Sequence, residues 1–390
     1  MSSADSIVIV GAARTPLGSF QGKLKSVTAP ELGSIAIRAA LERSGLKDKS
    51  PDEVFMGCVL PAGLKQAPAR QAALGADLPK SIVCTTINKV CGSGMKAAML
   101  GHDAIIAGSA KIVVAGGMES MTNAPYLLPK ARGGYRMGHG QVLDHMFLDG
   151  LENAYDSALM GRFAEDTAEK YQFTRAVQDE FALTSLSRAK MAASDGIFAR
   201  EIVAVKAGGE LVEADEQPTR ADPAKIPQLK PAFRDGGTVT AANSSSISDG
   251  AAALILMSEG EANRNNLRPL ARIVGHATHA QEPAWFTTAP VGAIEKLLEK
   301  IGWRHDEVDL YEINEAFAVV VLAAIRDLSL PPEKVNVHGG ACALGHPIGA
   351  SGARIIVTLL NALETRNLKR GVASLCIGGG EATAFAVERF

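Results

Sequence analysis

An alternation of strand-like and helix-like segments runs twice through this chain, and it limits the folds that the chain can adopt. Short apolar runs that predict strands are separated by longer amphipathic segments that predict helices. In the first half, the expected strands are 7–10, 54–59, 81–86 and 111–115, and the expected helices are 28–45, 69–75 and 92–107. This alternation is typical of an α/β protein, so we expect a mostly parallel sheet with helices on both faces.

The second half of the chain repeats this order. Its expected strands are 271–274, 308–313, 335–337 and 371–377, and its expected helices are 293–299, 315–328 and 349–363. The two halves also end alike, because Val113–Glu119 and Leu375–Glu381 each run from an apolar strand through glycines to a glutamate. This likeness predicts a duplicated α/β unit, with one half in residues 1–119 and about 241–268 and the other in residues 269–390.

Residues 120–240, between the two halves, have a different character. They begin with loops rich in Met, Pro, Gly and Tyr and continue through one amphipathic helix at about 174–193. A polar stretch with several prolines follows. We interpret this segment as an inserted loop domain that stands on the first half, and such insertions often carry substrate specificity.

Charge and cysteine content exclude several classes of protein. The 40 Lys and Arg residues are balanced by 42 Asp and Glu residues, which gives no support for a nucleic acid or an anionic membrane surface as partner. Apolar runs fall far short of the roughly 20 residues of a membrane helix, and the short polar start predicts no signal or transit peptide. The five cysteines are an odd number without a Cys-x-x-Cys pair, so we expect no disulfides, no structural zinc and a reducing, cytoplasmic location.

The segment from Asn88 to Met95 reads Asn-Lys-Val-Cys-Gly-Ser-Gly-Met and places Cys91 where a predicted strand turns into a helix. The glycines that follow permit a sharp turn and let a ligand approach the backbone. At a helix N-terminus the unpaired N–H groups favour a thiolate, and they can also hold an oxyanion. Cys58 and Cys84 lie inside predicted strands and suit a structural role, whereas the position of Cys91 predicts a reactive nucleophile.

The same turn also matches a dinucleotide-binding pattern. Gly92 to Ala97 reads Gly-x-Gly-x-x-Ala between a predicted strand and a predicted helix, and Glu119 follows as a candidate ribose ligand. A nicotinamide-dependent oxidoreductase is therefore a competing prediction. A dinucleotide site has no use for a cysteine at the turn, which weighs against it.

Three further residues with suitable chemistry are predicted near strand ends. His346 lies in the glycine-rich stretch Gly339–Gly352, and a histidine can accept a thiol proton near neutral pH. Cys376 precedes a run of three glycines, and Asn314 stands at another strand-to-helix junction. Because the carboxyl ends of strands form the ligand crevice of an α/β sheet, we expect these three side chains to meet Cys91 there.

Read together, these segments resemble the thiolase family along essentially the whole chain. Four motifs occur in family order: Asn-x-Val-Cys-Gly-Ser-Gly at 88–94, Asn-Glu-Ala-Phe at 314–317, Gly-His-Pro-x-Gly-x-Ser-Gly at 345–352 and Cys-x-Gly-Gly-Gly at 376–380. Further matches are at 10–16, 116–121 and 249–253. The resemblance implies two thiolase-like α/β halves packed as αβαβα layers, with an insertion that binds substrate and CoA and makes oligomer contacts.

The resemblance implies a role for each residue of the candidate site. Cys91 resembles the nucleophile that accepts the acyl group from CoA, and His346 resembles the base that activates it. Cys376 resembles the acid/base cysteine that moves a proton at the α-carbon of the second acyl-CoA. Asn314, acting through a water, resembles one oxyanion hole together with His346. The backbone N–H groups of Cys91 and Gly378 resemble the other oxyanion hole.

The resemblance also implies the reaction and its ligands. Two acetyl-CoA would give acetoacetyl-CoA and CoA, or the reverse, in a ping-pong exchange through an acetyl-Cys91 intermediate. CoA is then substrate and product, and neither a metal nor a redox cofactor is expected. Ser245 resembles the position that meets the pantetheine arm, and Arg220 resembles a residue near the adenine. Met160 and Phe317 resemble the wall around the acyl group. The family further implies a homotetramer and a place in fatty acid metabolism.

Departures from the family pattern leave the acyl chain length open. Leu159 stands where short-chain members often have histidine, and Ala382 stands where many members have glycine. Glu381 adds a charge, and Phe286 is larger than expected. A broader 3-ketoacyl-CoA thiolase of β-oxidation is therefore the nearest alternative. More distant alternatives are a decarboxylating condensing enzyme, a catalytically silent acyl-CoA-binding relative and the nicotinamide oxidoreductase.

Overall fold

Strands from both halves of the chain join in one sheet. The computed structural model describes residues 5–46 and 51–390, and over this part ten strands are hydrogen-bonded edge to edge. Their order is β12 (Leu310–Ile313), β13 (Arg370–Ile377), β14 (Glu381–Glu388), β11 (Ala271–Ala280), β1 (Ile7–Arg14), β10 (Ser248–Ser258), β5 (Ile112–Ser120), β3 (Glu53–Gly57) and β4 (Val83–Ile87), with β2 (Gly18–Ser19) beside β10. Among the described strands, β1 and β11 are the pair that joins the two halves of the sheet, through the pairs Val8–Arg272 and Ile9–Ala271.

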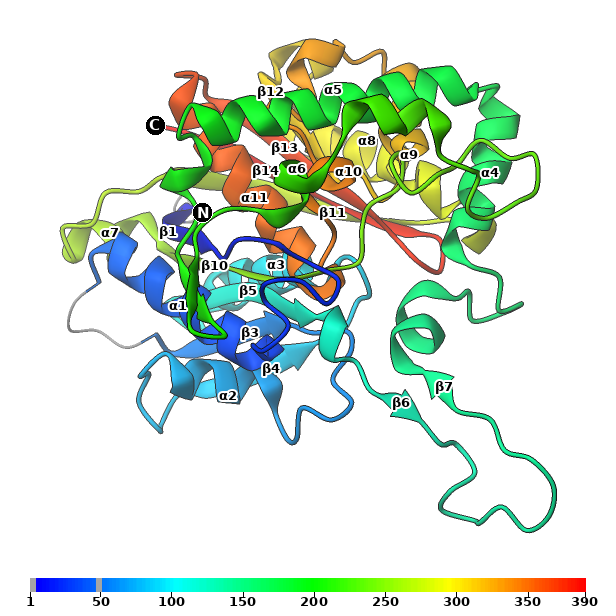
Figure 1. Ribbon diagram of the computed structural model, residues 1–390. Helices are drawn as coiled ribbons and strands as arrows, with labels where there is room; N and C mark the ends of the chain where they lie inside the picture. Colours follow the sequence, from blue (N-terminus) through cyan, green and yellow to red (C-terminus); the bar gives the residue numbers. More distant parts are fainter. Residues whose placement is uncertain (1–4, 47–50) are drawn as a thin grey trace.

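Helices cover both faces of each half of this sheet (Figure 1). In the N-terminal half, α1 (Ala29–Ser44) and α2 (Pro68–Gly75) pack on one face. In the C-terminal half, α8 (Ala289–Ile301) and α9 (Ala318–Asp327) do the same. Between the halves, α3 (Ser93–Ile106) and α11 (Ile348–Thr365) pack on each other and contact strands of both. The expected αβαβα layering is therefore confirmed.

The strand directions differ from the expected mostly parallel sheet. Within the described chain, the parallel pairs are β3–β4, β3–β5 and β12–β13, and the other pairs are antiparallel. The reason lies in β10 and β14, which the sequence analysis does not predict. β10 runs antiparallel to both β1 and β5, and β14 runs antiparallel to both β13 and β11. A strand that returns through a tight turn, as β14 does after Gly378–Gly380, must run antiparallel to the preceding strand.

Two expected elements are shorter than predicted. The strand expected at 335–337 is reduced, in the described chain, to isolated bridges between Val335 and Tyr311 and between Val337 and Gly339. The helix expected over 315–328 begins only at Ala318. The residue before it, Phe317, is still extended, with φ of −143°. The segment 314–317 is therefore a loop at the end of β12 and not the first helical turn.

The inserted segment wraps over both halves. It contains β6 (Tyr126–Leu127), β7 (Leu143–Asp144), α4 (Met160–Tyr171), α5 (Arg175–Ser194), β8 (Val205–Ala207), β9 (Glu210–Val212) and α6 (Glu216–Arg220). The helix α5 confirms the helix expected at about 174–193. Figure 1 shows β6, β7 and the loop between them as an arm that extends away from the body. The remaining helices are α7 (Glu259–Arg264) and α10 (Ala341–Leu344).

None of the helices in the described ranges is long and apolar enough to cross a membrane. The residues 1–4 of the polar start lie outside the described part of the chain.

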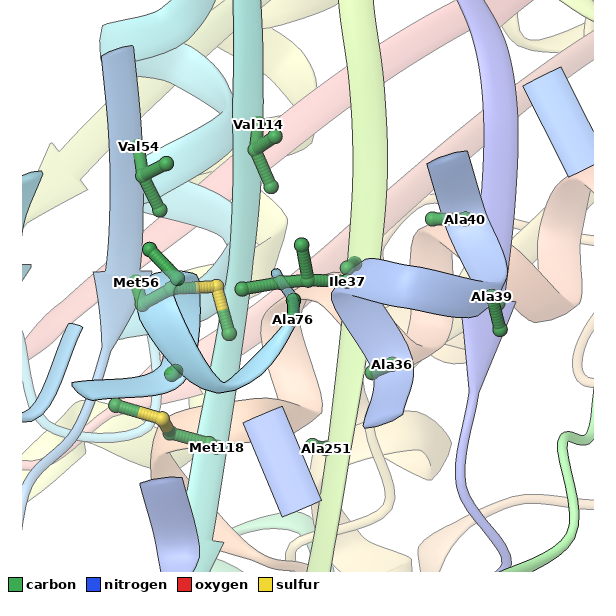
Figure 2. Packing of buried hydrophobic residues seen from close by; sticks show 14 of the residues in the cluster. Ala36, Ile37, Ala39, Ala40, Val54, Met56, Ala76, Val114, Met118 and Ala251 are labelled. Atoms are coloured by element: carbon green, nitrogen blue, oxygen red, sulfur yellow. The ribbon is translucent and has the colours of Figure 1, made fainter. Parts of the chain in front are cut away.

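Small side chains let α1 lie close to the sheet. Figure 2 shows Ile37 of α1 beside Met56 of β3 and near Val114 of β5, with Ala36 and Ala40 along the same helix. All of these side chains are fully buried. Burial of one such aliphatic side chain contributes roughly 1.5–3 kcal/mol, so this packing holds the outer helix layer to the N-terminal strands.

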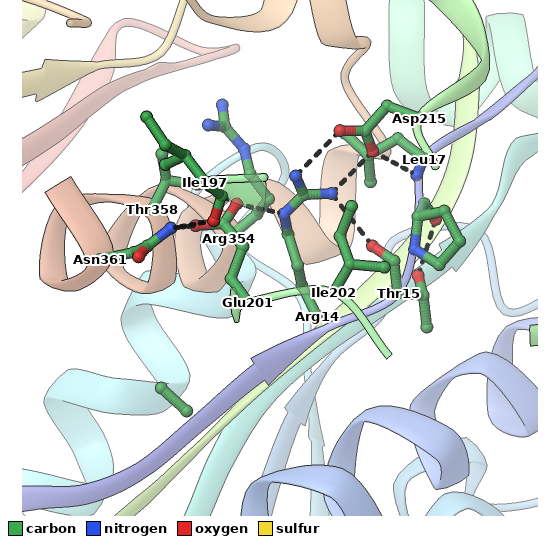
Figure 3. Close-up of polar contacts among 12 residues, drawn as sticks. Arg14, Thr15, Leu17, Ile197, Glu201, Ile202, Asp215, Arg354, Thr358 and Asn361 are labelled. Atoms are coloured by element: carbon green, nitrogen blue, oxygen red, sulfur yellow. Dashed lines mark hydrogen bonds and ion pairs between the residues drawn. The ribbon is translucent and has the colours of Figure 1, made fainter. Parts of the chain in front are cut away.

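A buried ion network fastens the insertion to both halves (Figure 3). Arg14 of β1 is fully buried, and its guanidinium contacts Asp215 at 2.7 and 2.9 Å. Its Nε donates to Glu201 at 2.5 Å. Glu201 also accepts hydrogen bonds from Thr358 at 3.1 Å and Asn361 at 3.0 Å, both on α11. Burial acts to lower the pKa of Arg14, but the two carboxylates outweigh it and raise the pKa, so the guanidinium stays charged.

We expect Arg14→Met to destabilise the fold strongly. The substitution keeps much of the side-chain volume but leaves two buried carboxylates without their cation, and breaking a buried pair costs about 3–5 kcal/mol. The measurement is the midpoint of thermal or urea unfolding. Arg38→Met is the control, because the ion pair of Arg38 with Asp77 is exposed and is worth about 1 kcal/mol or less. Similar losses in the two variants would contradict the role given to the Arg14 network.

Candidate active site

Cys91 lies in a tight turn between β4 and α3. The residue before it, Val90, has φ of 44°, a left-handed conformation that β-branched residues rarely adopt and that costs about 1–3 kcal/mol. Ser93 holds the turn, because its Oγ accepts the N–H of Lys89 at 2.8 Å and donates to the carbonyl oxygen of Val90 at 2.7 Å. Strained backbone that is held by its surroundings is frequent at catalytic sites, so the turn fits a catalytic role for the thiol.

The Cys91 turn packs against the end of β13. A Cβ on Gly92 would collide with the side chain of Ile377, so glycine at this position lets the two segments approach. Cys376, the preceding residue on β13, is fully buried. Burial raises the pKa of its thiol well above the ordinary value, and ionisation of Cys91 would raise it further. The contact between Gly92 and Ile377 and this charge coupling place the thiols of Cys91 and Cys376 near each other.

The thiol of Cys91 is protonated in this environment at neutral pH. Burial raises its pKa to about 11, while the backbone N–H groups of Gly378 and of Cys91 itself act in the opposite direction. The N–H groups thus favour the thiolate, but burial outweighs them and keeps the proton on the sulfur. The thiol requires a base, and the two N–H groups at the sulfur are placed to hold negative charge beside it.

His346 has the features of that base. It is buried in the loop between α10 and α11, and its Nδ1 lies 2.6 Å from Ser351 Oγ. Ser351 Oγ in turn donates to the carbonyl oxygen of Pro347 at 2.9 Å, so Nδ1 carries the ring proton and donates to Ser351. Among the described residues, the buried Nε2 has no hydrogen-bond partner. Burial, reinforced by Arg354, lowers the pKa of His346 to about 3, so the ring is neutral and Nε2 presents a lone pair.

The loop of His346 lies beside both Cys91 and Asn314. Ile348, two residues after the histidine, belongs to an apolar cluster against which Cys91 packs. Asn314 follows β12, and its Nδ2 lies 3.5 Å from His346 Nδ1. Within the described chain, the buried Oδ1 of Asn314 has no hydrogen-bond partner. The residues predicted from separate strand ends therefore gather in one place, although His346 itself follows the short helix α10 and not a strand.

Glu119 is not available to a ribose. Its side chain is fully buried, and its carboxylate accepts the N–H groups of Val59, Leu60 and Gly349 at 2.9, 3.1 and 2.9 Å. Burial raises its pKa to about 7, while the three N–H groups act in the opposite direction. Glu119 thus joins the loop after β3 to the start of α11, and its assignment as a dinucleotide ligand is wrong.

The residues expected to form the acyl wall gather near Cys376. Met160 is the first residue of α4, and its Sδ lies next to Gly378. A Cβ added to Gly378 would be 3.5 Å from that sulfur, which is ordinary van der Waals contact. Phe317 is buried, with its ring edge-to-face against Phe233 at 6.0 Å between centroids. Met160 and Phe317 belong to the same apolar cluster as Cys376, and so does Phe286. This surrounding is apolar and closely filled, which suits a small acyl group.

An open cleft of about 590 Å³ lies beside the His346 loop. Its walls come from α5, α6, the 241–247 segment and the residues at the start of α10, and Arg220 and Ser246 are among the lining residues. Ser245 is not a lining residue, but it precedes Ser246, and its N–H donates to the carbonyl oxygen of Ala316 at 2.9 Å. The side chain of Arg220 is 61% exposed and pairs with Glu216 at 3.1 Å. The cleft therefore brings the region of Arg220 and the region of Ser245 to one surface.

Two residues that support the site are missing from the sequence analysis. Ser351 fixes the tautomer of His346, and its place in the glycine-rich motif on the first turn of α11 is the signal that could have identified it. Glu315 is fully buried and accepts hydrogen bonds from Ser185, Asn336 and the N–H of Cys342. It thereby locks the loop after Asn314 to the loop that leads to His346. A buried carboxylate beside a motif asparagine gives no local sequence signal of that role.

Comparisons with known proteins agree along the whole chain. The model for the N-terminal thiolase domain matches residues 7–260, and the model for the C-terminal thiolase domain matches residues 267–389. Acetyl-CoA acetyltransferase of Schizosaccharomyces pombe is 50% identical, over 98% of each chain. Acetyl-CoA acetyltransferase 2 of Arabidopsis thaliana is 52% identical over 98% of this chain and 96% of its own length.

Solved structures share the fold. The Acat5 thiolase of Ascaris suum in complex with coenzyme A is 44% identical and superimposes with a TM-score of 0.94, over 99% of this chain and 100% of that one. The acetyl-CoA acetyltransferase of Bacillus anthracis is 42% identical, with a TM-score of 0.96 over 100% of both chains.

Proposed function

This chain belongs to the thiolase family, and from that premise we propose that it is an acetyl-CoA acetyltransferase. It joins two acetyl-CoA into acetoacetyl-CoA and CoA, or runs the reverse reaction. The observation that carries the proposal is the meeting of two neighbouring thiols, Cys91 and Cys376, with a neutral His346 whose Nε2 lone pair is free. This chemistry needs three groups. They are an acyl carrier, a base that takes the proton of the carrier, and a second acid/base that moves the proton of the α-carbon.

In the first half-reaction, Nε2 of His346 takes the proton of Cys91 as the sulfur attacks the thioester carbonyl. The raised pKa of Cys91 and the lowered pKa of His346 make a preformed ion pair costly, so proton transfer accompanies the attack. The N–H groups of Cys91 and Gly378 receive the charge that develops on the acyl oxygen. The bond from carbon to the CoA sulfur breaks, and CoA leaves with the proton from His346.

In the second half-reaction, Nε2 of His346 takes the proton of the Cys376 thiol, and the resulting thiolate removes a proton from the α-carbon of a second acetyl-CoA. Burial raises the pKa of Cys376, which makes its thiolate a stronger base for a weakly acidic carbon. Asn314, through a water, and His346 stabilise the enolate. The enolate carbon attacks the acetyl group on Cys91, the carbon–carbon bond forms, and the bond to sulfur breaks. His346 returns its proton to the departing Cys91 sulfur, and Cys376 keeps the α-proton as its thiol, which restores the enzyme.

We expect Asn314→Ala to lower kcat by roughly 10²–10³-fold, the usual loss for one oxyanion donor, with a smaller effect on KM. Initial rates of acetoacetyl-CoA thiolysis over a range of substrate concentrations measure both constants. Asn265→Ala, at the partly buried C-terminal end of α7, serves as the control and should leave both unchanged. A change confined to KM would mean that Asn314 only positions the substrate.

CoA occupies the cleft of about 590 Å³ beside the His346 loop. Arg220 lines it with an exposed cationic head, which suits the phosphates near the adenine end. The 241–247 segment, with Ser245, runs from this cleft toward Phe317, since Ser244 and Phe317 form a bridge. It therefore follows the path that a pantetheine arm would take to the acyl group. The CoA-bound Ascaris suum structure supports a CoA site in a chain of this fold.

The test of the proposed function is a pair of initial rates with free CoA. One substrate is acetoacetyl-CoA, and the other is a longer 3-ketoacyl-CoA. Because Met160, Phe286 and Phe317 fill the space around Cys376, the shorter substrate should react faster. A faster rate with the longer substrate would identify a broader 3-ketoacyl-CoA thiolase of β-oxidation. Absence of any thioester exchange would identify a silent acyl-CoA-binding relative.

The assembly is a homotetramer. The arm that carries β6 and β7 exposes the apolar side chains of Tyr126, Leu128, Met137 and Val142, and Met137 is 93% exposed. In the described chain, β4 is one of the two edge strands of the sheet, and its residue Val83 is also exposed. An exposed apolar edge strand and an apolar arm are surfaces that pairing with further copies would cover. Light scattering during gel filtration should give the mass of four chains, and a monomer mass would contradict this.

The protein acts in fatty acid metabolism in the cytoplasm. Its cysteines are all free in the structure, which suits a reducing compartment. Among relatives, one from Gibberella zeae is named cytosolic and one from Xenopus laevis mitochondrial, so cell fractionation with antibodies to this chain is the direct test.

A further inference from the structure

His102, Asp103 and His276 form a compact polar cluster outside the candidate active site. His102 and Asp103 lie near the C-terminal end of α3, and His276 lies on β11 of the other half. Oδ1 of Asp103 is 3.0 Å from Nδ1 of His102 and 2.9 Å from Nε2 of His276. One carboxylate oxygen thus brings together two imidazole nitrogens from distant parts of the sequence.

The spacing of this cluster suits a single metal ion. One candidate ligand atom from each residue lies within 4.8 Å of the others. Zn–N and Zn–O bonds are about 2.0–2.2 Å long, so ligand atoms around one ion lie roughly 3 Å apart. The two measured separations already have that size. The imidazole rings are perpendicular, at 88°, with centroids 5.0 Å apart, so small ring rotations suffice to aim both nitrogens at one point.

Charge and access also favour a cation. With both imidazoles neutral, as ligation of a metal requires, the carboxylate of Asp103 gives the cluster one net negative charge. The side chains of His102 and His276 are only 18% and 11% exposed, whereas that of Asp103 is 52% exposed. The cluster is therefore held by packing on one side and open to solvent on the other, where an ion can enter and water can complete its coordination. Lys300 is the opposing charge nearby, and its ammonium donates to the carbonyl oxygen of His276 at 3.1 Å.

We propose that His102, Asp103 and His276 bind a divalent transition-metal ion of the zinc class. A mixed imidazole and carboxylate set suits Zn²⁺, Co²⁺ or Ni²⁺, whereas Mg²⁺ and Ca²⁺ prefer oxygen ligands throughout. The ion takes no part in acetyl transfer. It ties α3, whose N-terminal end follows the Cys91 turn, to β11 of the other half. The site therefore stabilises the junction between the two halves.

The experiment uses Co²⁺ as the probe, with the full-length protein. We expect one Co²⁺ per chain, with visible d–d absorption and without the intense sulfur-to-cobalt band of a thiolate ligand. His276→Ala and the nearly isosteric Asp103→Asn should each weaken binding by at least about 10-fold. His139→Ala, an exposed histidine outside the cluster, and Cys91→Ser should bind as the unmodified protein does.

A second measurement distinguishes loss of metal binding from poor folding of a variant. Saturating Zn²⁺ should raise the thermal unfolding midpoint of the unmodified protein and of His139→Ala but not that of Asp103→Asn, because only an ion bound in the cluster stabilises the folded state. The proposal is overturned if no saturable Co²⁺ binding occurs at millimolar concentrations. It is equally overturned if Asp103→Asn and His276→Ala bind normally, or if the absorption is that of a thiolate and disappears in Cys91→Ser.

Discussion

Cys91→Ser is expected to reduce acetyl transfer by roughly 10⁴–10⁶-fold, the range seen when an enzyme loses its nucleophile. A serine hydroxyl is a far weaker nucleophile than a thiol, and the burial that already raises the pKa of Cys91 would oppose ionisation of the hydroxyl too. Rates of acetoacetyl-CoA formation and thiolysis measure the loss. Mass spectrometry after mixing with acetyl-CoA should show one acetyl group per unmodified chain, on Cys91, and none in the variant.

The matched control for that experiment is Cys84→Ser, in β4 seven positions before the nucleophile. Cys84 is a half-buried free thiol, and we expect its loss to leave labelling and turnover intact. Finding the acetyl group on Cys342 or Cys376 of the unmodified protein would overturn the assignment of Cys91 as the acyl carrier.

Cys376→Ala should separate the two halves of the reaction. The variant keeps Cys91 and His346, so it should still take an acetyl group from acetyl-CoA onto Cys91. Condensation should fall by at least the roughly 10²–10⁴-fold typical of a missing general base, because nothing removes the α-proton. Thiolysis should fall with it, since the leaving carbanion is protonated by the same group. Both quantities, acetyl labelling and acetoacetyl-CoA formation, are measured on one folded preparation.

Cys58→Ala provides the comparison for folding and packing. Its thiol is as deeply buried as that of Cys376 and donates a long hydrogen bond of 3.7 Å to Glu119, so its removal tests the cost of losing a buried sulfur together with that weak bond. We expect both half-reactions to survive in this variant. If Cys376→Ala instead loses labelling together with condensation, the division of labour between the two cysteines is wrong.

Much of the architecture could be predicted from local patterns. The helix around α1 has a capping box at Thr28 and a left-handed glycine after its last turn, at Gly45, and both signals lie in a few neighbouring residues. The turn at Cys91 and the loop at His346 are equally local, because glycines at fixed spacing determine where the backbone can bend. The sequence therefore predicts the layered fold and the meeting of the catalytic motifs. The three-part domain division stays a prediction.

The other features of the fold and the site depend on contacts between residues far apart in the sequence, which local patterns do not predict. β10 and β14 run antiparallel to their neighbours because of where the chain returns in space. An apolar run in the sequence does not indicate whether the strand will pair in the parallel or the antiparallel direction. The protonated state of Cys91 follows from burial, which outweighs the helix end. Glu119 resembles a ligand in a linear pattern but is enclosed by three backbone N–H groups from two segments that lie far apart in the sequence.

The position of β10 has a consequence for how the chain is made. β10 fills the space between β1 and β5, yet the ribosome delivers it only after the whole inserted segment has emerged. Until then both neighbours present an unpaired edge, the feature that draws nascent strands into intermolecular pairing. A nascent chain arrested before residue 248 should therefore be held by chaperones that bind open strand edges, and one arrested well after residue 280, when β11 has also covered the other edge of β1, should release them. The N-terminal half is the first to be synthesised, but its sheet closes only once synthesis has passed well beyond it.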